Sequence, residues 1–136
     1  MGKRNYQVNT TLGNAIGDLS DALASFAEDI RNSADNMGET FPGSDRTTRY
    51  EEAADALESI SLDTETPEDL LDVKVSFQED TRANPTNRTR LGNLVNAAEA
   101  IFAAAQDATA GRDDEDLDAY VAMLESVFDE LQGVEL

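Results

Sequence analysis

The segment TTLGNAIGDLSDALASFAEDIRNSADNM (Thr10–Met37) decides the fold class of this chain. Its large apolar residues recur with alternating spacings of four and three, at Leu12, Ile16, Leu19, Leu23, Phe26 and Ile30. Because an α-helix has 3.6 residues per turn, this spacing collects them in a seam along one face. The segment therefore predicts a long amphipathic helix whose seam is its contact surface.

Two glycines, Gly13 and Gly17, lie one turn apart near the start of this segment. Small residues at this spacing allow two helices to approach closely. The contact is either with a partner helix or with another part of the same chain. We favour packing inside the domain, because no long apolar segment accompanies the glycines.

Three further segments, Thr48–Ile60, Asn87–Ala108 and Asp114–Gln132, also repeat their apolar residues at helical spacing. The first opens with Thr48 and Glu51 at the spacing of a capping box. The residues expected to be buried are Tyr50, Ala53, Leu57 and Ile60 in the first segment, Leu91, Leu94, Val95, Ala98, Ile101, Phe102 and Ala105 in the second, and Leu117, Tyr120, Val121, Leu124, Phe128 and Leu131 in the third. Prolines, glycines and small polar residues mark loops at 37–44, 61–66, 81–85 and 110–113.

Residues 66–79 combine two patterns. Thr66-Pro67-Glu68-Asp69 is typical of a helix start, with a capping threonine, proline at the first helical position and acids in the first turn. Val73, Val75 and Phe77 then alternate with polar residues, which is typical of a strand. Residues 1–9 alternate in the same way at Tyr6 and Val8, so they form either an N-terminal arm or a short partner strand. So small a ribbon needs helices behind it.

Together these patterns predict a single mainly α-helical domain over residues 1–136. It is a bundle of about four helices at 10–37, 48–60, 87–108 and 114–132, and a small two-stranded β ribbon is the addition that residues 1–9 and 66–79 suggest. A chain of 136 residues suits one domain. Aromatic residues make up 6% and tryptophan is absent, so alanine and aliphatic residues must fill the core, which favours close helix packing.

The residue types exclude much chemistry. The chain has no cysteine and no histidine, so thiol nucleophiles, disulfides, zinc sites with imidazole or thiolate ligands and a histidine general base are impossible. It also lacks a nucleotide-binding glycine loop and a nucleophile elbow. We therefore expect a protein that is not an enzyme and uses no cofactor.

The start of the chain bears on location. Residues 1–6 carry two positive charges, but no apolar run follows them, so we do not expect a signal peptide. No apolar run is long enough to span a bilayer. The expected location is the cytoplasm (that of the host, if the protein is viral), with no membrane partner.

The net charge of −19 is concentrated in two windows. Residues 51–80 hold eleven acids and one base, and residues 107–136 hold ten acids and one base, whereas residues 81–106 have a net charge of +2. Such a chain repels nucleic acids and anionic membranes and attracts basic surfaces. The expected partner is therefore a basic, nucleic-acid-binding protein rather than nucleic acid itself.

The acidic residues expected to bind this partner lie on two helices around a nearly uncharged one. On the segment 48–60, carboxylates at i, i+4 and i+7 form a row with a spacing of roughly 5–6 Å. Like charges at this spacing oppose helix formation, so a cause other than local stability is expected. The candidate binding residues are Glu51, Glu52, Asp55 and Glu58 in one group and Asp113, Asp114, Glu115, Asp116 and Asp118 in the other.

Three explanations of this acidity compete. The first is a solvated face that keeps a small protein soluble. The second is salt adaptation, because two lysines against eight arginines and a pI near 4.1 are typical of extreme halophiles. The third is nucleic-acid mimicry, in which carboxylates occupy a basic groove built for phosphates spaced about 1.7 Å apart along the DNA axis.

A calcium site is an alternative use of the second acidic group. Asp114, Asp116, Asp118 and Glu125 fall at positions 1, 3, 5 and 12 of an EF-hand loop. Position 6 is Ala119, where the sharp turn requires glycine, and helical periodicity runs through the supposed loop. We favour an acid-rich helix N-terminus stabilised by the helix dipole, and expect no metal.

Over its full length the chain resembles, in composition and helical character rather than in any motif, the small acidic helical proteins of viruses and mobile elements of bacteria and archaea. The resemblance implies an anti-defence inhibitor that blocks host nucleic-acid-binding machinery. The function expected here is an acidic module that docks on the basic groove of a nucleic-acid-binding protein and competes with nucleic acid. The alternatives are a structural subunit of a virus particle that self-associates through the first-helix seam, and an ordinary small regulator from a halophile.

Overall fold

The described part of the chain contains four α-helices, one 3-10 turn and one two-stranded sheet. The computed structural model describes residues 5–60, 62, 65–81 and 84–136. In chain order the elements are β1 (Asn5–Thr11), α1 (Leu12–Thr40), α2 (Asp45–Ser59), the 3-10 turn η1 (Glu68–Leu70), β2 (Lys74–Asp80), α3 (Asn87–Thr109) and α4 (Glu115–Gln132). The predicted mainly α-helical fold with a two-stranded ribbon is confirmed.

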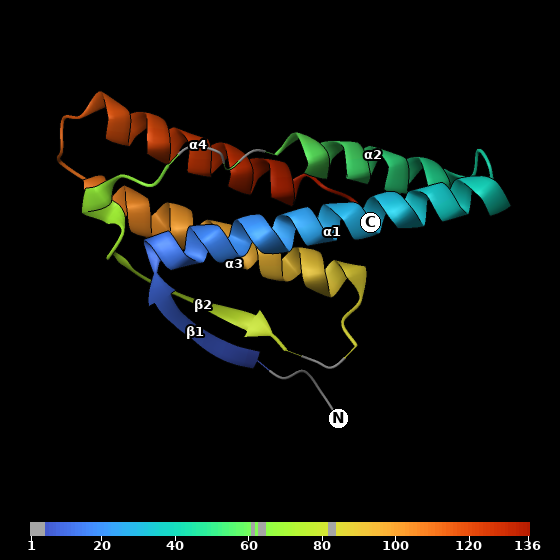
Figure 1. Ribbon diagram of the computed structural model, residues 1–136, viewed down its shortest axis with the longest axis horizontal. Coiled ribbons are helices and arrows are strands. Elements are labelled where there is room, and N and C mark those ends of the chain that lie inside the picture. The colour runs from blue at the N-terminus through green and yellow to red at the C-terminus, as the bar shows by residue number, and fades with distance from the viewer. Residues whose placement is uncertain (1–4, 61, 63–64, 82–83) are drawn as a thin grey trace.

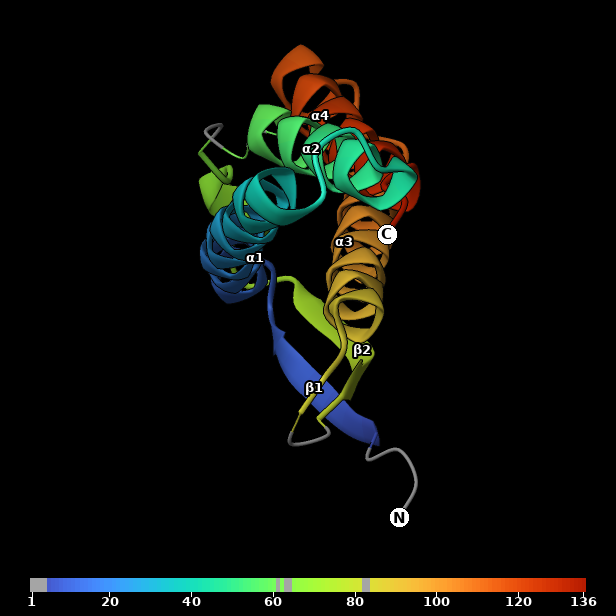
Figure 2. The same ribbon diagram turned by 90° about the vertical axis from the view of Figure 1, so that its right-hand side faces the viewer.

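The elements form three layers (Figures 1 and 2). α1 and α3 lie antiparallel in the middle layer, the ribbon covers one side of them, and α2 and α4 cover the other. α2 folds back on α1, and α4 folds back on α3. The two acidic helices are therefore external, as expected, but the nearly uncharged α3 shares the centre with α1.

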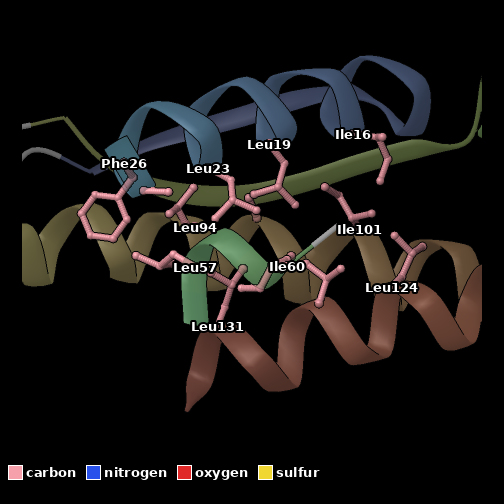
Figure 3. Packing of buried hydrophobic residues seen from close by; sticks show 14 of the residues in the cluster. Ile16, Leu19, Leu23, Phe26, Leu57, Ile60, Leu94, Ile101, Leu124 and Leu131 are labelled. Carbon is pink, nitrogen blue, oxygen red and sulfur yellow. The ribbon is translucent and has the colours of Figure 1, made fainter. Parts of the chain in front are cut away.

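The seam of α1 lies inside the molecule. Leu12, Leu19, Phe26 and Ile30 are each at most 3% exposed, and Figure 3 shows this face of α1 directed toward α3, α2 and α4. Ile101, at the centre of α3, is fully buried between α1 and α4. The seam therefore packs inside the domain, and in this structure it is not exposed for self-association.

The first predicted loop begins later than expected. α1 continues through Gly38 to Thr40, and the Phe41 amide donates to the Met37 carbonyl at 2.6 Å. Pro42 is the residue that stops the helix, because proline disfavours helical geometry in the residue before it. A single glycine costs a helix only about 1 kcal/mol, so Gly38 does not end it.

α2 begins three residues before the predicted start. Its N-cap is Ser44, whose hydroxyl accepts the Thr47 amide at 3.1 Å, while the Thr47 hydroxyl donates to the Phe41 carbonyl at 2.9 Å. Thr48 lies inside the first turn, so the capping box predicted with Glu51 is wrong. Gly43, with φ +77, supplies the left-handed turn that positions Ser44.

Pairing of the two strands brings the start of α1 beside the segment 68–80. β1 pairs antiparallel with β2 in a register that sets Val8 opposite Phe77. The Gly13 amide then donates to the Leu71 carbonyl at 3.2 Å, and a Cβ on Gly13 would lie 2.9 Å from Leu71 Cδ2. Close packing inside the domain therefore explains Gly13. A Cβ on Gly17 would meet nothing within 4 Å, so Gly17 makes no such contact.

The two halves of the chain share one order of elements. Each half is a strand, a long helix and a shorter helix that folds back. β1 is antiparallel to β2, and α1 is antiparallel to α3, so the two halves run in opposite directions (Figure 1). Short identities accompany this order, because Leu12-Gly13-Asn14 recurs as Leu91-Gly92-Asn93 and Leu57-Glu58-Ser59 recurs as Leu124-Glu125-Ser126. The domain is thus two strand–helix–helix units packed face to face.

Candidate interaction surface

All nine carboxylate residues predicted to bind a partner are exposed. The structure does not bring their two groups together. Glu51, Glu52, Asp55 and Glu58 lie on α2, which occupies the right-hand half of Figure 1, whereas residues 113–118 lie at the start of α4, at the left-hand end. The molecule therefore offers two separate acidic surfaces, which have to be considered one at a time.

The row on α2 is partly neutralised by an arginine from α1. Arg31 donates from Nε to Glu58 Oε2 at 3.0 Å and from Nη2 to Glu58 Oε1 at 2.7 Å, and Nη2 also reaches Asp55 Oδ1 at 2.5 Å. These hydrogen bonds raise the pKa of Arg31, with the Glu58 bond the larger cause, and lower the pKa of the Glu58 carboxyl. Two of the three carboxylates in the row thus join α2 to α1, which is a structural cause for their presence.

The first half of α2 also carries positive charge. Arg46 and Arg49 are exposed, and the Arg46 guanidinium lies 5.7 Å from the centre of the Tyr50 ring. Across the described ranges 5–60, 62, 65–81 and 84–136, neither arginine has an Asp or Glu carboxylate within 4.0 Å. The outer face of α2 is therefore mixed in charge, and Glu51 and Glu52 are what remains of its predicted anionic surface.

The start of α4 is a different environment. Asp114 caps the helix, and its Oδ1 accepts the Asp116 amide at 3.0 Å and the Leu117 amide at 3.4 Å. Acidic residues at 115, 116 and 118 occupy the first turn. Carboxylates here are stabilised by the partial positive charge of the helix N-terminus, so this cluster forms without an arginine beneath it.

Two contacts fasten a second acidic segment to this helix start. Arg112 Nη2 lies 3.1 Å from Asp69 Oδ2, and the hydroxyls of Thr66 and Tyr120 are 2.8 Å apart. Burial raises the pKa of Tyr120, although its bond to Thr66 opposes that rise. The turn around η1 is thereby held beside the α3–α4 connection, at one end of the molecule (Figure 1).

We call the resulting surface the acidic end. Its members are exposed carboxylate side chains from two segments more than forty residues apart, with Arg112 the one base in residues 65–72 and 107–118. They are Glu65, Glu68, Asp69 and Asp72 from the first segment and Asp113, Asp114, Glu115, Asp116 and Asp118 from the second. Sequence reasoning found the second set and missed the first, because nothing in the local pattern indicates that residues 65–72 lie beside residues 113–118.

The calcium loop considered from the sequence does not form. α4 continues as a helix from Glu115 to Gln132, through Ala119 and Glu125, and Asp114 is used as the cap. In a helix, side chains at i, i+2 and i+4 point in different directions. Among the residues with described positions, no group of three or more acidic side chains is placed to hold a metal ion.

Comparison with known proteins adds no family to this geometry. No protein-family model matches the chain, and neither the curated proteins nor the solved structures gave a significant match. Within the described part of the chain, no helix combines the length and apolar character needed to cross a membrane.

Proposed function

We propose that this protein is an interaction module whose acidic end docks on the basic groove of a nucleic-acid-binding protein and competes there with nucleic acid. One observation carries the proposal. Two acidic segments, distant in sequence, are held side by side by the Arg112–Asp69 ion pair and the Thr66–Tyr120 hydrogen bond, and their carboxylates face solvent. The fold thus concentrates negative charge at one place.

The physical advantage of such a surface is electrostatic. Like-charged carboxylates held together repel one another, and a groove lined with arginine and lysine relieves that repulsion on contact. Long-range attraction also speeds the encounter, and it weakens as salt screens the charges. A basic groove that binds phosphates offers this complement, so the protein and a nucleic acid would exclude each other from it.

The test is capture of partners by the immobilised protein from a lysate of its native host, followed by elution with duplex DNA. We expect nucleic-acid-binding proteins to be retained at about 0.1 M salt, to be released by DNA, and to be retained at least tenfold less well at about 0.5 M salt, where screening is stronger. Retention that DNA does not reverse would contradict the competition.

A pair of variants with equal charge separates the acidic end from general acidity. The first neutralises four residues of the acidic end without touching the Asp114 cap or Asp69: E68Q, D113N, E115Q and D116N. The control neutralises the same number of aspartates and glutamates on exposed positions of α1: D21N, E28Q, D35N and E39Q. We expect only the first variant to lose its partners. Equal losses in both would assign binding to net charge alone.

Salt adaptation is a second candidate, favoured by a separate observation. Exposed carboxylates also line α1, at Asp18, Asp21, Glu28, Asp29 and Asp35, so acidity is not confined to the two predicted windows. A surface that is acidic on several sides is what a protein needs to remain hydrated and soluble in concentrated salt. Under this candidate the protein is a halophile's small regulator, and its stability rather than its binding depends on the carboxylates.

A further inference from the structure

The strand β1 lies in the longest uncharged run of this chain. The thirteen residues from Asn5 to Gly17 carry no charge, although 29% of all residues are charged. In a molecule with a net charge of −19, a second copy that pairs with this strand meets no like charge on the strand itself. The absence of charge also matters for a strand, because charged side chains are what usually protect an exposed sheet edge.

The two outer edges of the ribbon, one on β1 and one on β2, have different neighbours in the fold. On β2, the Asp80 amide donates to Asn93 Oδ1 at 3.0 Å, and Asn93 Nδ2 donates to the Asp80 carbonyl at 3.0 Å. Asn96 from the same helix reaches the Gln78 carbonyl at 3.5 Å. α3 therefore covers the C-terminal half of the outer edge of β2, at Gln78 and Asp80, with amide side chains. Lys74, Glu79 and Asp80 add charges to that strand.

Among the residues that the structure describes, none covers the outer edge of β1 in this way. In an antiparallel ribbon, the backbone groups of successive residues point alternately toward and away from the partner strand. Those of Gln78 and Asp80 point toward α3, so the backbone groups of residues 75, 77 and 79 form the hydrogen bonds to β1. Their partners on β1 are residues 10, 8 and 6. The backbone groups of Gln7, Asn9 and Thr11 then point away from β2. Within the described residues, no backbone hydrogen bond outside the ribbon reaches those of Gln7 and Asn9, whereas Thr11 is the N-cap of α1 and its carbonyl faces the first turn of that helix. An edge left open in this way is a template for another strand.

The side chains of β1 complement themselves. When two copies pair antiparallel with Val8 on the two-fold axis, Val8 faces Val8, Tyr6 faces Thr10, and Gln7 faces Asn9. An aromatic residue opposite a β-branched one is a favourable cross-strand pair, and no like charges meet. The side-chain oxygens of Gln7 and Asn9 already accept hydrogen bonds from Gln78 and Ser76 of β2. This pairing also keeps the side chains on the same faces as in the existing ribbon. There, Val8 lies opposite Phe77 on the face that is directed toward α1 and α3.

We infer that two copies of this chain associate through β1, forming a four-stranded antiparallel sheet in the order β2-β1-β1-β2. Gln7 of each copy exchanges backbone hydrogen bonds with Asn9 of the other. The wider sheet also corrects a weakness of the single chain, since a two-stranded ribbon is marginal by itself. The start of α4 lies on the opposite side of α1 and α3 from the ribbon (Figure 1), whereas the Glu65–Asp72 part of the acidic end adjoins the start of β2. The inference rests on β1 alone, so it does not depend on the proposed function.

Sedimentation in about 1 M KCl, where the Debye length is about 3 Å, is the first test. We expect the wild-type protein to sediment with twice the 14.7 kDa mass of one chain at micromolar concentration. The variant Q7E/N9E sets carboxylates opposite each other across the new pair of strands and should be monomeric. Its control, S76E/Q78E, adds the same charge to the same face of the ribbon on β2 and should remain dimeric. A monomeric wild-type protein, or equal behaviour of the two variants, overturns the inference.

The absence of cysteine allows a second test that does not depend on stability. In the variant V8C, two thiols meet on the two-fold axis with their Cα atoms about 4.5 Å apart, within the range a disulfide spans. Oxidised glutathione should convert V8C to a disulfide-linked dimer, and the glutathione is itself reduced to two molecules of the free thiol. S76C, with its cysteine on β2, should stay unlinked. Crosslinking of S76C and not V8C would assign the interface to the other edge.

The acidic-end variant described above separates the two proposals. E68Q/D113N/E115Q/D116N should remain dimeric in sedimentation even if it loses its partners, because none of its changes touches β1. A variant that loses dimerisation with these four changes would place the interface at the acidic end, and the β1 inference would be wrong.

Discussion

At the scale of single residues, Arg31 explains side chains that the sequence leaves unexplained. Glu51, Asp55 and Glu58 repel one another along α2, yet Arg31 from the neighbouring helix contacts both Asp55 and Glu58. The Arg31 guanidinium offsets the repulsion between these carboxylates and at the same time joins α1 to α2. The same contact reduces the charge that α2 can offer to a partner, which is why the acidic end is the better candidate surface.

We expect Arg31→Met to lower the Tm modestly at neutral pH. The difference in Tm between the variant and the wild type should become smaller in molar salt, because salt screens exposed ion pairs. The folded-state pKa of Glu58 lies below its unfolded value. The Arg31–Glu58 pair therefore stabilises the protein fully at pH values above the pKa that Glu58 has in the unfolded chain. This stabilisation is lost as the pH falls through the pKa that Glu58 has in the folded protein. Thermal melts of R31M, E58Q and the double variant from neutral to acidic pH measure the coupling. A coupling that stays constant at low pH would contradict the ion pair.

At the scale of elements, the helix starts show how short side chains define boundaries. Ser44 and Asp114 each satisfy amides of the following turn, and both helices begin at the next residue. In α4 the cap is itself a carboxylate at the centre of the acidic end. Its structural and electrostatic roles must be separated before any binding loss is interpreted.

Two substitutions of Asp114 make that separation. Asp114→Ala removes the cap and should lower the free energy of unfolding by about 1 kcal/mol, whereas Asp114→Asn keeps a capping oxygen and should lose a smaller part of it. Urea denaturation followed by circular dichroism gives both values. Partner capture should fall in both variants if the charge matters, and only in the alanine variant if the cap alone matters.

At the scale of the whole molecule, self-repulsion among 29 acids and 10 bases is the dominant electrostatic fact. Exposed carboxylates lie on α1 as well as on α2, α4 and the turn around η1. Screening relieves this repulsion and weakens the few ion pairs at the same time. The sign of the net effect distinguishes a salt-adapted protein from one whose acidity serves binding alone.

We expect the Tm to rise as KCl increases from about 0.05 M to about 2 M, because repulsion across the surface outweighs four described ion-pair contacts. Substantial loss of helix at the lowest salt would favour the halophile candidate. A Tm that is flat or falls with salt would exclude salt adaptation as the reason for the acidity. Choline chloride serves as a second screening salt to separate screening from specific potassium binding.

The sequence by itself determined what depends on periodicity and on residue type. The 3.6-residue repeat in Leu12–Ile30 predicted α1 and its buried face, the alternation at residues 73–77 predicted β2, and the missing cysteine and histidine excluded thiol and imidazole chemistry. Boundaries that rest on single side chains were less accurate, as Ser44 and Pro42 illustrate. The repeat of strand, helix and helix was missed because only a few short identities mark it.

The tertiary structure alone decided which distant residues meet. Arg31 lies 24 and 27 residues before the two carboxylates it binds, and Asp69 lies 43 residues before Arg112. No local pattern contains such separations, since they follow from how the helices fold back on one another. For the same reason only the fold decides that α3 covers one edge of the ribbon and leaves the other open. Periodicity reports which face of an element is buried, but the neighbour it is buried against is a property of the whole chain.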